Sequence, residues 1–151
     1  MERYYGEYFI SDDQRKLQPD RICAMLSSTY WASERSCERI LRSIENSLCV
    51  GVYWEGEQVA FARCVTDYAT IFWLADVIVD ERFRGHGIGK EMVGAILSHE
   101  RLEGLSGILA TRDAHTLYEK FGFVAVDPAR YMRRPAQAQE LPARLYDEEE
   151  E

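Results

Sequence analysis

The sequence predicts one mixed α/β domain, in which a central sheet of about six to seven strands carries helices on both faces. The first observation behind this prediction is residues 71–79, an almost continuous apolar run that is typical of a strand buried on both faces. The second is the order of hydrophobic periodicities along the chain, which reads strand, two helices, three strands, then helix, strand, helix and two short strands.

The N-terminal third is expected to hold one strand and two amphipathic helices. Residues 1–10 are aromatic and alternate in places, which favours a strand. Pro19 opens the first helix, and Ser33 is the expected N-cap of the second, which ends at Asn46. The apolar stripes of these helices are Ile22, Met25 and Leu26 in the first, and Cys37, Ile40, Leu41 and Ile44 in the second.

The remainder of the chain alternates strands and helices. Glu55 and Gly56 separate two strand patterns and indicate a hairpin. The expected strands are residues 48–54, 57–67, 71–79 and 105–110, with short closing strands at 124–126 and 131–133. The expected helices are residues 87–99 and 112–121.

Length and charge indicate one small domain with an acidic tail. The chain has 151 residues and a net charge of −8. Residues 135–151 carry six acidic residues and one arginine, a charge of −5, which leaves −3 for residues 1–134. We therefore assign residues 1–134 to the domain and expect residues 135–151 to be loosely ordered. The mildly acidic body weakly favours a cationic or neutral amine over an anionic acceptor.

Several classes of partner and site are disfavoured. The acidic balance argues against nucleic acid. No run approaches the roughly 18 apolar residues of a membrane span and no cationic and apolar leader opens the chain, so we expect no membrane partner and a cytoplasmic location. The widely spaced cysteines are interpreted as buried thiols: Cys23, Cys37, Cys49 and Cys64. We expect no metal, because these histidines do not pair with the cysteines at zinc-ligand spacing: His86, His99 and His115.

Residues 84–90, Arg-Gly-His-Gly-Ile-Gly-Lys, form a glycine-rich turn between the central strand and the next helix. Glycines let a loop curl with its amide groups pointing inward, and the start of a helix adds partial positive charge. Arg84 and Lys90 add full charges. The stretch therefore predicts a phosphate-binding loop, with a turn that binds no ligand as the alternative.

Two of three known phosphate-loop patterns do not fit. Gly85 and Gly89 are separated by three residues where a P-loop needs four, and Glu91 stands where that loop needs a hydroxyl. The dinucleotide fingerprint would need a third glycine at position 90. The third pattern, Arg-x-x-Gly-x-Gly, is met by Arg84, Gly87 and Gly89, and it resembles the acyl-CoA pyrophosphate loop of the GNAT superfamily of N-acetyltransferases.

A second stretch, residues 108–123, resembles the superfamily's helix that ends in Leu-Tyr-x-Lys-x-Gly-Phe. Thr111 departs from this pattern, because many members carry an asparagine there; a threonine can still cap the helix. Together the two motifs span residues 73–123, about a third of the chain. The matching residues are Ala114, Leu117, Tyr118, Lys120, Gly122 and Phe123.

The resemblance implies a GNAT-like fold and acetyl-CoA as co-substrate, with no metal. It implies that the central strand separates from the next parallel strand, and that the pantetheine arm enters this gap along the strand backbone. A backbone N–H near Val77 would polarise the thioester carbonyl. The implied cofactor-binding residues are Val77, Ile78, Val79, Arg84, Gly85, His86, Gly87, Ile88, Gly89, Lys90 and Tyr118.

The same resemblance implies that Tyr118 is the general acid. A phenol of pKa about 10 lies close to a thiol of pKa about 8.5, so proton transfer to a departing thiolate is reasonably matched. The alternative is a tyrosine that packs the helix against the sheet. His115, three residues earlier on the same helix face, either tunes the tyrosine or lies at the surface.

Asp76 is the first candidate for the general base, and two interpretations of this residue remain open. An unpaired carboxylate within the apolar central strand would be costly, and burial raises carboxyl pKa values, which suits a base near neutral pH. In the other interpretation Asp76 is structural and pairs with an arginine such as Arg63. Asp67 and Glu34 are lower-ranked candidates.

The expected activity is direct transfer of the acetyl group to the primary amine of a small molecule in a ternary complex. The acceptor pocket is expected to be formed by the first two helices and the turn before the central strand, and no residue identifies the substrate. A non-catalytic acyl-CoA-binding or interaction module with the same fold is the alternative, and a homodimer is left open. The aromatic residues available to the pocket are Tyr30, Trp31, Tyr68 and Phe72.

Overall fold

The computed structural model describes residues 1–136, 141 and 142, so most of the predicted tail lies outside the described residues. Within this part of the chain, six strands form one sheet in the order β1-β2-β3-β4-β5-β6. All neighbouring strands are antiparallel except β5 and β6, which are parallel. The strands are β1 (Glu2–Tyr5), β2 (Tyr8–Ser11), β3 (Leu48–Trp54), β4 (Glu57–Thr66), β5 (Ile71–Val79) and β6 (Ser106–Ile108).

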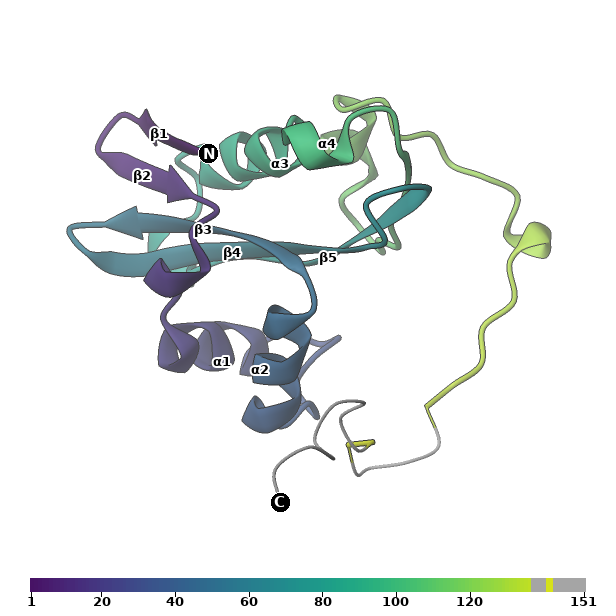
Figure 1. Ribbon diagram of the computed structural model, residues 1–151, viewed down its shortest axis with the longest axis horizontal. Helices are drawn as coiled ribbons and strands as arrows, with labels where there is room; N and C mark the ends of the chain where they lie inside the picture. The colour runs from purple at the N-terminus through teal and green to yellow at the C-terminus, as the bar shows by residue number, and fades with distance from the viewer. Residues whose placement is uncertain (137–140, 143–151) are drawn as a thin grey trace, which may run out of the picture.

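Helices cover both faces of the sheet (Figure 1). Helices α3 (Ile88–Leu97) and α4 (His115–Glu119) lie on one face, and α1 (Pro19–Ser27) and α2 (Cys37–Glu45) lie on the other. The mixed α/β class with helices on both faces is thereby confirmed. In the part of the chain that the structure describes, no helix has the length and apolar character needed to cross a membrane. Short 3-10 turns are η1 (Gln14–Lys16), η2 (Glu81–Phe83), η3 (Glu100–Leu102) and η4 (Pro128–Arg130).

The helices on each face of the sheet pack against it and form a separate apolar cluster. Ile88, Met92 and Ile96 of α3 are buried on one face, and Ile22 and Leu26 of α1 are buried on the other. Burying one such side chain contributes about 1.5–3 kcal/mol. Because Ile88 is the first residue of α3, the core fixes the start of this helix directly beside the glycine-rich turn.

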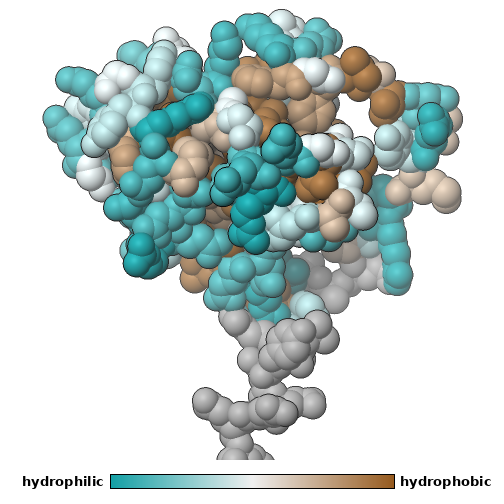
Figure 2. Space-filling model, turned by 45° about the horizontal axis from the view of Figure 1, so that its top comes forward, coloured by the Kyte–Doolittle hydropathy of each residue, from teal (hydrophilic) through white to brown (hydrophobic). Residues whose placement is uncertain are grey.

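The strand predictions fail at both ends of the domain. Residues 1–10 do not form one strand but most of a hairpin, β1–β2, around Gly6, whose φ of 57° is a left-handed conformation that suits glycine. Residues 124–126 and 131–133 form no strands. Val124 is 78% exposed there. Figure 2 shows that apolar side chains also reach the surface among the polar ones on the face that it draws. β6 consequently remains an edge strand of the described sheet.

Other element boundaries shift by a few residues. The N-cap of α2 is Ser36 and not Ser33, because Ser36 Oγ accepts the backbone N–H of Arg39 at 3.2 Å. The last parallel strand and the last helix are both shorter than the hydrophobic patterns predicted.

The interpretation of the cysteines is wrong for two of the four. Cys23 of α1 and Cys37 of α2 form a disulfide, with their Cα atoms 5.6 Å apart. Cys49 and Cys64 are buried free thiols, as predicted, and burial raises the pKa of each to about 12. The disulfide joins the two helices that flank the α1–α2 loop, residues 28–36.

Candidate active site

A cleft opens at the edge of the sheet where β5 and β6 separate. The two strands pair only from Ile71 to Trp73 of β5. Beyond this point one wall of the cleft is residues 73–77 of β5, and the opposite wall is residues 109–114, which follow β6. The cleft has a volume of about 690 Å³ and includes Tyr118 of α4. The chain therefore has a gap between its central strand and the next parallel strand.

A β-bulge lies on the β5 wall of this cleft. The pairing of β4 with β5 shifts between Phe61 and Arg63, so that β5 has one extra residue. Asp76, within the bulge, has a φ of 54°, which is uncommon for a residue other than glycine. Because a bulge removes its extra residue from the ladder of hydrogen bonds, it provides a physical reason for a backbone donor near Val77.

Asp76 is buried and its carboxylate is fully paired. Oδ2 accepts from Arg63 Nε at 2.6 Å and from Arg35 Nη1 at 2.8 Å, and Oδ1 accepts from Trp31 Nε1 at 3.2 Å. Burial by itself raises the pKa of Asp76, but the two arginines outweigh it, and the net pKa is lowered. The prediction that Asp76 has the raised pKa of a general base is therefore wrong. The pairing with Arg63 expected of a structural aspartate is present.

The α1–α2 loop forms the rim of the cleft next to Asp76. Tyr30 packs edge-on against Trp31, with ring centroids 5.1 Å apart. The guanidinium carbon of Arg112 lies 3.8 Å from the centroid of the Tyr30 ring. Since Arg112 belongs to the wall that follows β6, this cation–π contact joins that wall to the α1–α2 loop. The sequence analysis named Tyr30 and Trp31 but missed Arg35 and Arg112, because no local pattern marks either arginine.

Tyr118 lies on the opposite wall, in α4. The segment before α4 is fixed by Thr111, whose Oγ1 accepts the backbone N–H of Ala114 at 3.0 Å. The Tyr118 ring is half-buried and packs edge-on against Phe123, with centroids 6.2 Å apart. Burial, and then the negative charge of Asp113, raise the pKa of Tyr118. The phenol therefore stays protonated at neutral pH, as a proton donor requires.

The glycine-rich turn lies between β5 and α3, as expected. Gly85 and Gly87 have φ values of 85° and 80°, so both adopt the left-handed conformation. Tyr5 Oη donates to the carbonyl oxygen of His86 at 2.9 Å, and α3 begins at the buried Ile88. Backbone conformation, one tyrosine and one core residue thus define the shape of this turn.

The turn has the properties that a pyrophosphate group needs. A Cβ atom at Gly87 would lie 2.7 Å from Tyr5 Oη, so a side chain there would displace the Tyr5 hydroxyl in addition to straining the left-handed backbone. A Cβ atom at Gly89 would meet only Val79, at an ordinary 3.6 Å. Exposed Arg84 and Lys90 flank the N-terminus of α3, whose amides and dipole attract anions. These residues fit the diphosphate of acetyl-CoA.

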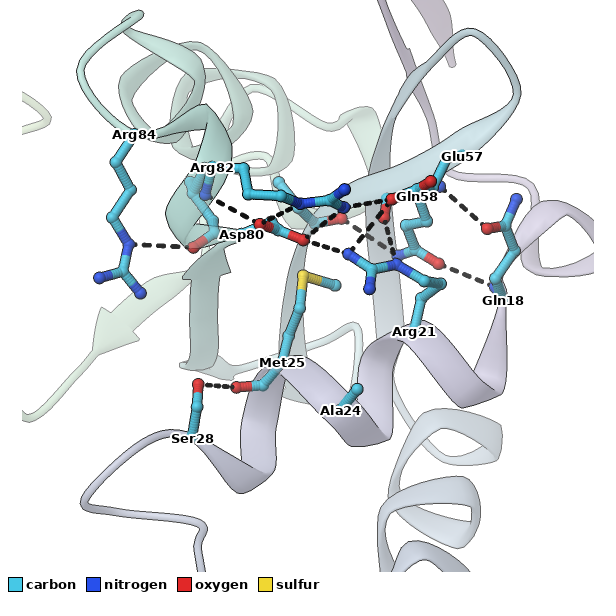
Figure 3. Close-up of polar contacts among 12 residues, drawn as sticks. Gln18, Arg21, Ala24, Met25, Ser28, Glu57, Gln58, Asp80, Arg82 and Arg84 are labelled. Carbon is cyan, nitrogen blue, oxygen red and sulfur yellow. Dashed lines mark hydrogen bonds and ion pairs between the residues drawn. The ribbon is translucent and has the colours of Figure 1, made fainter.

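Asp80, which the sequence analysis did not single out, ties the turn to α1 (Figure 3). Its carboxylate accepts the backbone N–H of Arg82 at 2.9 Å and pairs with Arg21 of α1. Hydrogen bonds from the Arg82 side chain hold the pKa of Asp80 well below its usual range. Arg82 also pairs with Glu57 of β4. The signal in the sequence is an aspartate at a strand end with an arginine two residues later.

Other predicted residues lie away from the cleft. Tyr68 and Glu34 do not line it, and Phe72 packs in the core. The carboxylate of Asp67 accepts from the Thr70 hydroxyl and from backbone amides of its own turn, which lowers its pKa. His115 is exposed. A larger hollow of about 890 Å³ beside β6 and η3 contains neither Tyr118 nor Asp76, and we do not assign it to the site.

The remaining residues predicted to bind the cofactor lie in two different places. Val77 lines the cleft with Asp76. Ile78 and Val79 instead line a hollow of about 150 Å³ beside Arg84. Arg84 Nε donates to the carbonyl oxygen of Val79 at 3.1 Å (Figure 3), so its guanidinium group is held at the end of β5.

Curated relatives of this chain are acetyltransferases by name. The spermine/spermidine N(1)-acetyltransferase of Bacillus subtilis is 27% identical over 127 residues, which cover 76% of this chain and 84% of that protein. A Gibberella zeae protein provisionally named an acetyltransferase is 30% identical over 119 residues. That match covers 66% of this chain and 66% of the relative, so the chain spans about two thirds of that relative's length.

Solved structures and the family pattern agree with these relatives. A crystal structure from Xanthomonas campestris, provisionally assigned as a GNAT-family acetyltransferase, matches with a TM-score of 0.83 and 38% identity. The match covers 88% of this chain and 96% of that chain. The pattern of the Acetyltransferase (GNAT) family matches residues 14–123, which include the bulge, the glycine-rich turn and Tyr118. The chain therefore belongs to the GNAT acetyltransferase family.

Proposed function

We propose that this protein is an N-acetyltransferase that transfers the acetyl group of acetyl-CoA to the primary amine of a small molecule by direct attack in a ternary complex. The observation that carries the proposal is the cleft between β5 and β6, because it has a β-bulge on one wall and a protonated Tyr118 on the other. Membership of the GNAT family implies the use of acetyl-CoA.

The chain's own residues would hold this co-substrate at two places. Residues 84–90 would bind the diphosphate through backbone amides, the start of α3 and the cations Arg84 and Lys90. The backbone of residues 77–79 would run along the pantetheine arm, and an N–H near Val77 would donate to the thioester carbonyl. The bound thioester supplies an acyl group with a thiolate leaving group.

Tyr118 would be the catalytic acid. Tyr118 lines the cleft that contains the β5 bulge, and its raised pKa keeps the proton on the phenol until a stronger base forms. The neutral amine would form the C–N bond as the C–S bond breaks, and the phenol would donate its proton to the departing thiolate. The surplus proton on the acylated nitrogen would return to the phenolate through solvent. A positioned acid typically contributes about 10²–10⁴ in rate.

Asp76 would act as a positioning residue and not as the base. Its carboxylate is ionised and already accepts from three side chains, so it is poorly suited to accept a proton near neutral pH. Its contacts instead hold the α1–α2 loop against β5, which shapes the acceptor side of the cleft. The amine would then lose its proton to solvent before it attacks.

An amine acceptor is supported by the relatives. The Bacillus subtilis relative is named for acetylation of spermine and spermidine, which are amines. The relative's name supports the amine as the reacting group, while the remainder of the acceptor depends on the cleft of this chain.

Release of free thiol from acetyl-CoA over a panel of primary amines tests the proposal. We expect thiol release that depends on the amine, with equimolar N-acetylated product confirmed by mass spectrometry. Calorimetric titration of acetyl-CoA provides the control for cofactor binding. Tight binding of acetyl-CoA without transfer to any amine would instead support the non-catalytic acyl-CoA-binding module.

A further inference from the structure

The cleft between β5 and the segment after β6 has a surplus of positive charge. Four arginines and two aspartates line it, a formal excess of two positive charges, in a chain whose net charge is −8. The overall composition therefore does not account for this local charge. The composition weakly favours a cationic or neutral acceptor, whereas the positive lining of the cleft favours an anionic one. The charged lining residues are Arg35, Arg63, Arg112, Arg133, Asp76 and Asp113.

The four arginines fall into two groups. Arg35 and Arg63 both donate to Oδ2 of Asp76, so one buried carboxylate already occupies two guanidinium groups. Arg112 and Arg133 are exposed, and among the described residues no carboxylate lies within ion-pair distance of either. Within the described part of the chain, their N–H donors therefore have no carboxylate partner.

Arg112 is held in place, unlike a typical surface arginine. Its guanidinium group stacks on the ring of Tyr30, Tyr30 packs on Trp31, and Trp31 donates to Asp76 in the bulge. Stacking leaves the edge of the guanidinium plane free, and this edge is the part that binds carboxylate and phosphate oxygens in a bidentate manner. The contacts thus present a fixed fork of donors beside the cleft.

A positive lining also acts on the reacting amine. Nearby positive charge disfavours a protonated ammonium group and lowers its pKa, which increases the fraction of neutral amine that can attack. A second cationic group on the acceptor would be repelled by the same charges. An anionic group would be attracted, and it would orient the amine toward the thioester end of the cleft.

We propose that the acceptor is a primary amine that carries an oxyanion, a carboxylate or a phosphate, and that Arg112 and Arg133 bind this oxyanion. The inference rests on the proposed function, because it assigns the specificity of the same cleft. It distinguishes this chain from a polyamine acetyltransferase, whose substrate has several positive charges and is suited by a cleft lined with carboxylates.

The experiment compares acceptors that differ only in the anionic group. Glycine, leucine and phenylalanine are paired with their amides, and phosphoethanolamine is paired with ethanolamine; spermidine represents the cations. We expect kcat/KM to favour the anionic member of at least one series by about tenfold or more, mainly through KM. The series that shows the preference identifies the oxyanion as carboxylate or phosphate.

Two variants and a matched control assign the preference to the arginines. Arg112→Gln and Arg133→Gln are each expected to reduce the anionic preference severalfold, with acetyl-CoA affinity unchanged. Arg112→Gln also loses the stacking on Tyr30 and should lower the thermal midpoint slightly, whereas Arg133→Gln should not. Arg134→Gln removes the same charge from an exposed neighbour that does not line the cleft, and it should keep the preference. A readout without turnover is the affinity of the CoA complex for N-acetylated products, which should show the same ranking.

The outcomes separate this inference from the proposed function. Acetylation of amides or spermidine as efficiently as of anionic amines would overturn the inference and leave the acetyltransferase intact. A preference that survives both arginine variants would overturn the assignment to Arg112 and Arg133. Binding of acetyl-CoA with no transfer to any amine would overturn the proposed function, and the inference with it.

Discussion

The two ends of the candidate site differ in composition: backbone groups form the cofactor end, and side chains form the acceptor end. The cofactor end, residues 84–90, is made of backbone in left-handed conformations at Gly85 and Gly87 and of one helix N-terminus. The acceptor end is made of side chains from the α1–α2 loop, β4, β5 and the segment after β6. The first end is continuous in the chain, whereas the second joins residues separated by up to about 100 positions.

This difference has a physical consequence for each end. Backbone amides recognise a diphosphate with little dependence on neighbouring side chains, so the cofactor end should tolerate most changes elsewhere. The acceptor end depends on the paired network around Asp76, in which removal of one partner leaves the others unpaired. A mutation at the cofactor end should therefore reduce binding of acetyl-CoA without disturbing the acceptor end, and a mutation at the acceptor end should leave binding of acetyl-CoA unchanged.

The largest effect is expected from Gly89→Asp at the cofactor end. The carboxylate would lie beside the diphosphate, and we expect the affinity for acetyl-CoA to fall by about 10³ or more, which is about 4 kcal/mol. Folding should persist, because an acidic residue in the first turn of α3 suits the helix dipole and a Cβ there has space. Calorimetric titration and thermal melting measure the two quantities.

Gly89→Ala is the matched control for this variant. It adds the Cβ without the charge, so it should cost far less affinity than Gly89→Asp. Gly87→Asp is a poorer test, because the left-handed backbone and Tyr5 would strain the fold as well. Unchanged affinity for acetyl-CoA in Gly89→Asp would overturn the assignment of the turn.

Asp76→Asn should disrupt the side-chain network of the acceptor end and leave the binding of acetyl-CoA at the cofactor end unchanged. Removing the charge leaves Arg35 and Arg63 without their carboxylate, and breaking such a buried pair costs about 3–5 kcal/mol of unfolding free energy. Urea denaturation should show this loss, while affinity for acetyl-CoA stays close to that of the parent. Asp113→Asn, which removes an exposed charge, should have little effect on stability.

The pH dependence of stability provides the same test by another route. Because the folded pKa of Asp76 is lowered, its contribution is present above the unfolded value of about 3.9 and is lost as pH falls through the folded value. The Asn variant should therefore lose stability less steeply below about pH 4 than the parent does. A stable Asn variant with full activity would remove Asp76 from every role considered above.

The disulfide is expected to have a smaller effect, again on the acceptor end. Cys23 and Cys37 are separated by 14 positions, and closing a loop of this size stabilises by about 3 kcal/mol at most in the chain-entropy account. The Cys23→Ser, Cys37→Ser double variant should melt at a lower temperature and show a raised KM for the amine. A reducing agent should shift the parent in the same way and leave the double variant unchanged; insensitivity of the parent would contradict the disulfide.

The same division explains what the sequence could predict. The central strand, the glycine-rich turn and the α4 motif were predictable, because each is a local pattern of period, glycine and helix. The Cys23–Cys37 disulfide and the Arg112–Tyr30 contact were not, because they depend on which separate segments meet. The hairpin at Gly6 is local, but the aromatic residues on both sides of the glycine made the stretch look like one strand. Asp76 lies between these cases: its burial was predictable, but the second arginine that lowers its pKa was not.

The comparison of Tyr118→Phe with the parent tests the central claim most directly, because it removes one proton donor from the cleft and almost no volume. With an acceptor amine present, we expect kcat to fall by about 10²–10³. Acetyl-CoA affinity and the thermal midpoint should change little, since the phenol acts mainly as the thiolate departs. An unchanged kcat together with a lowered thermal midpoint would show that Tyr118 is a packing residue and would contradict the account.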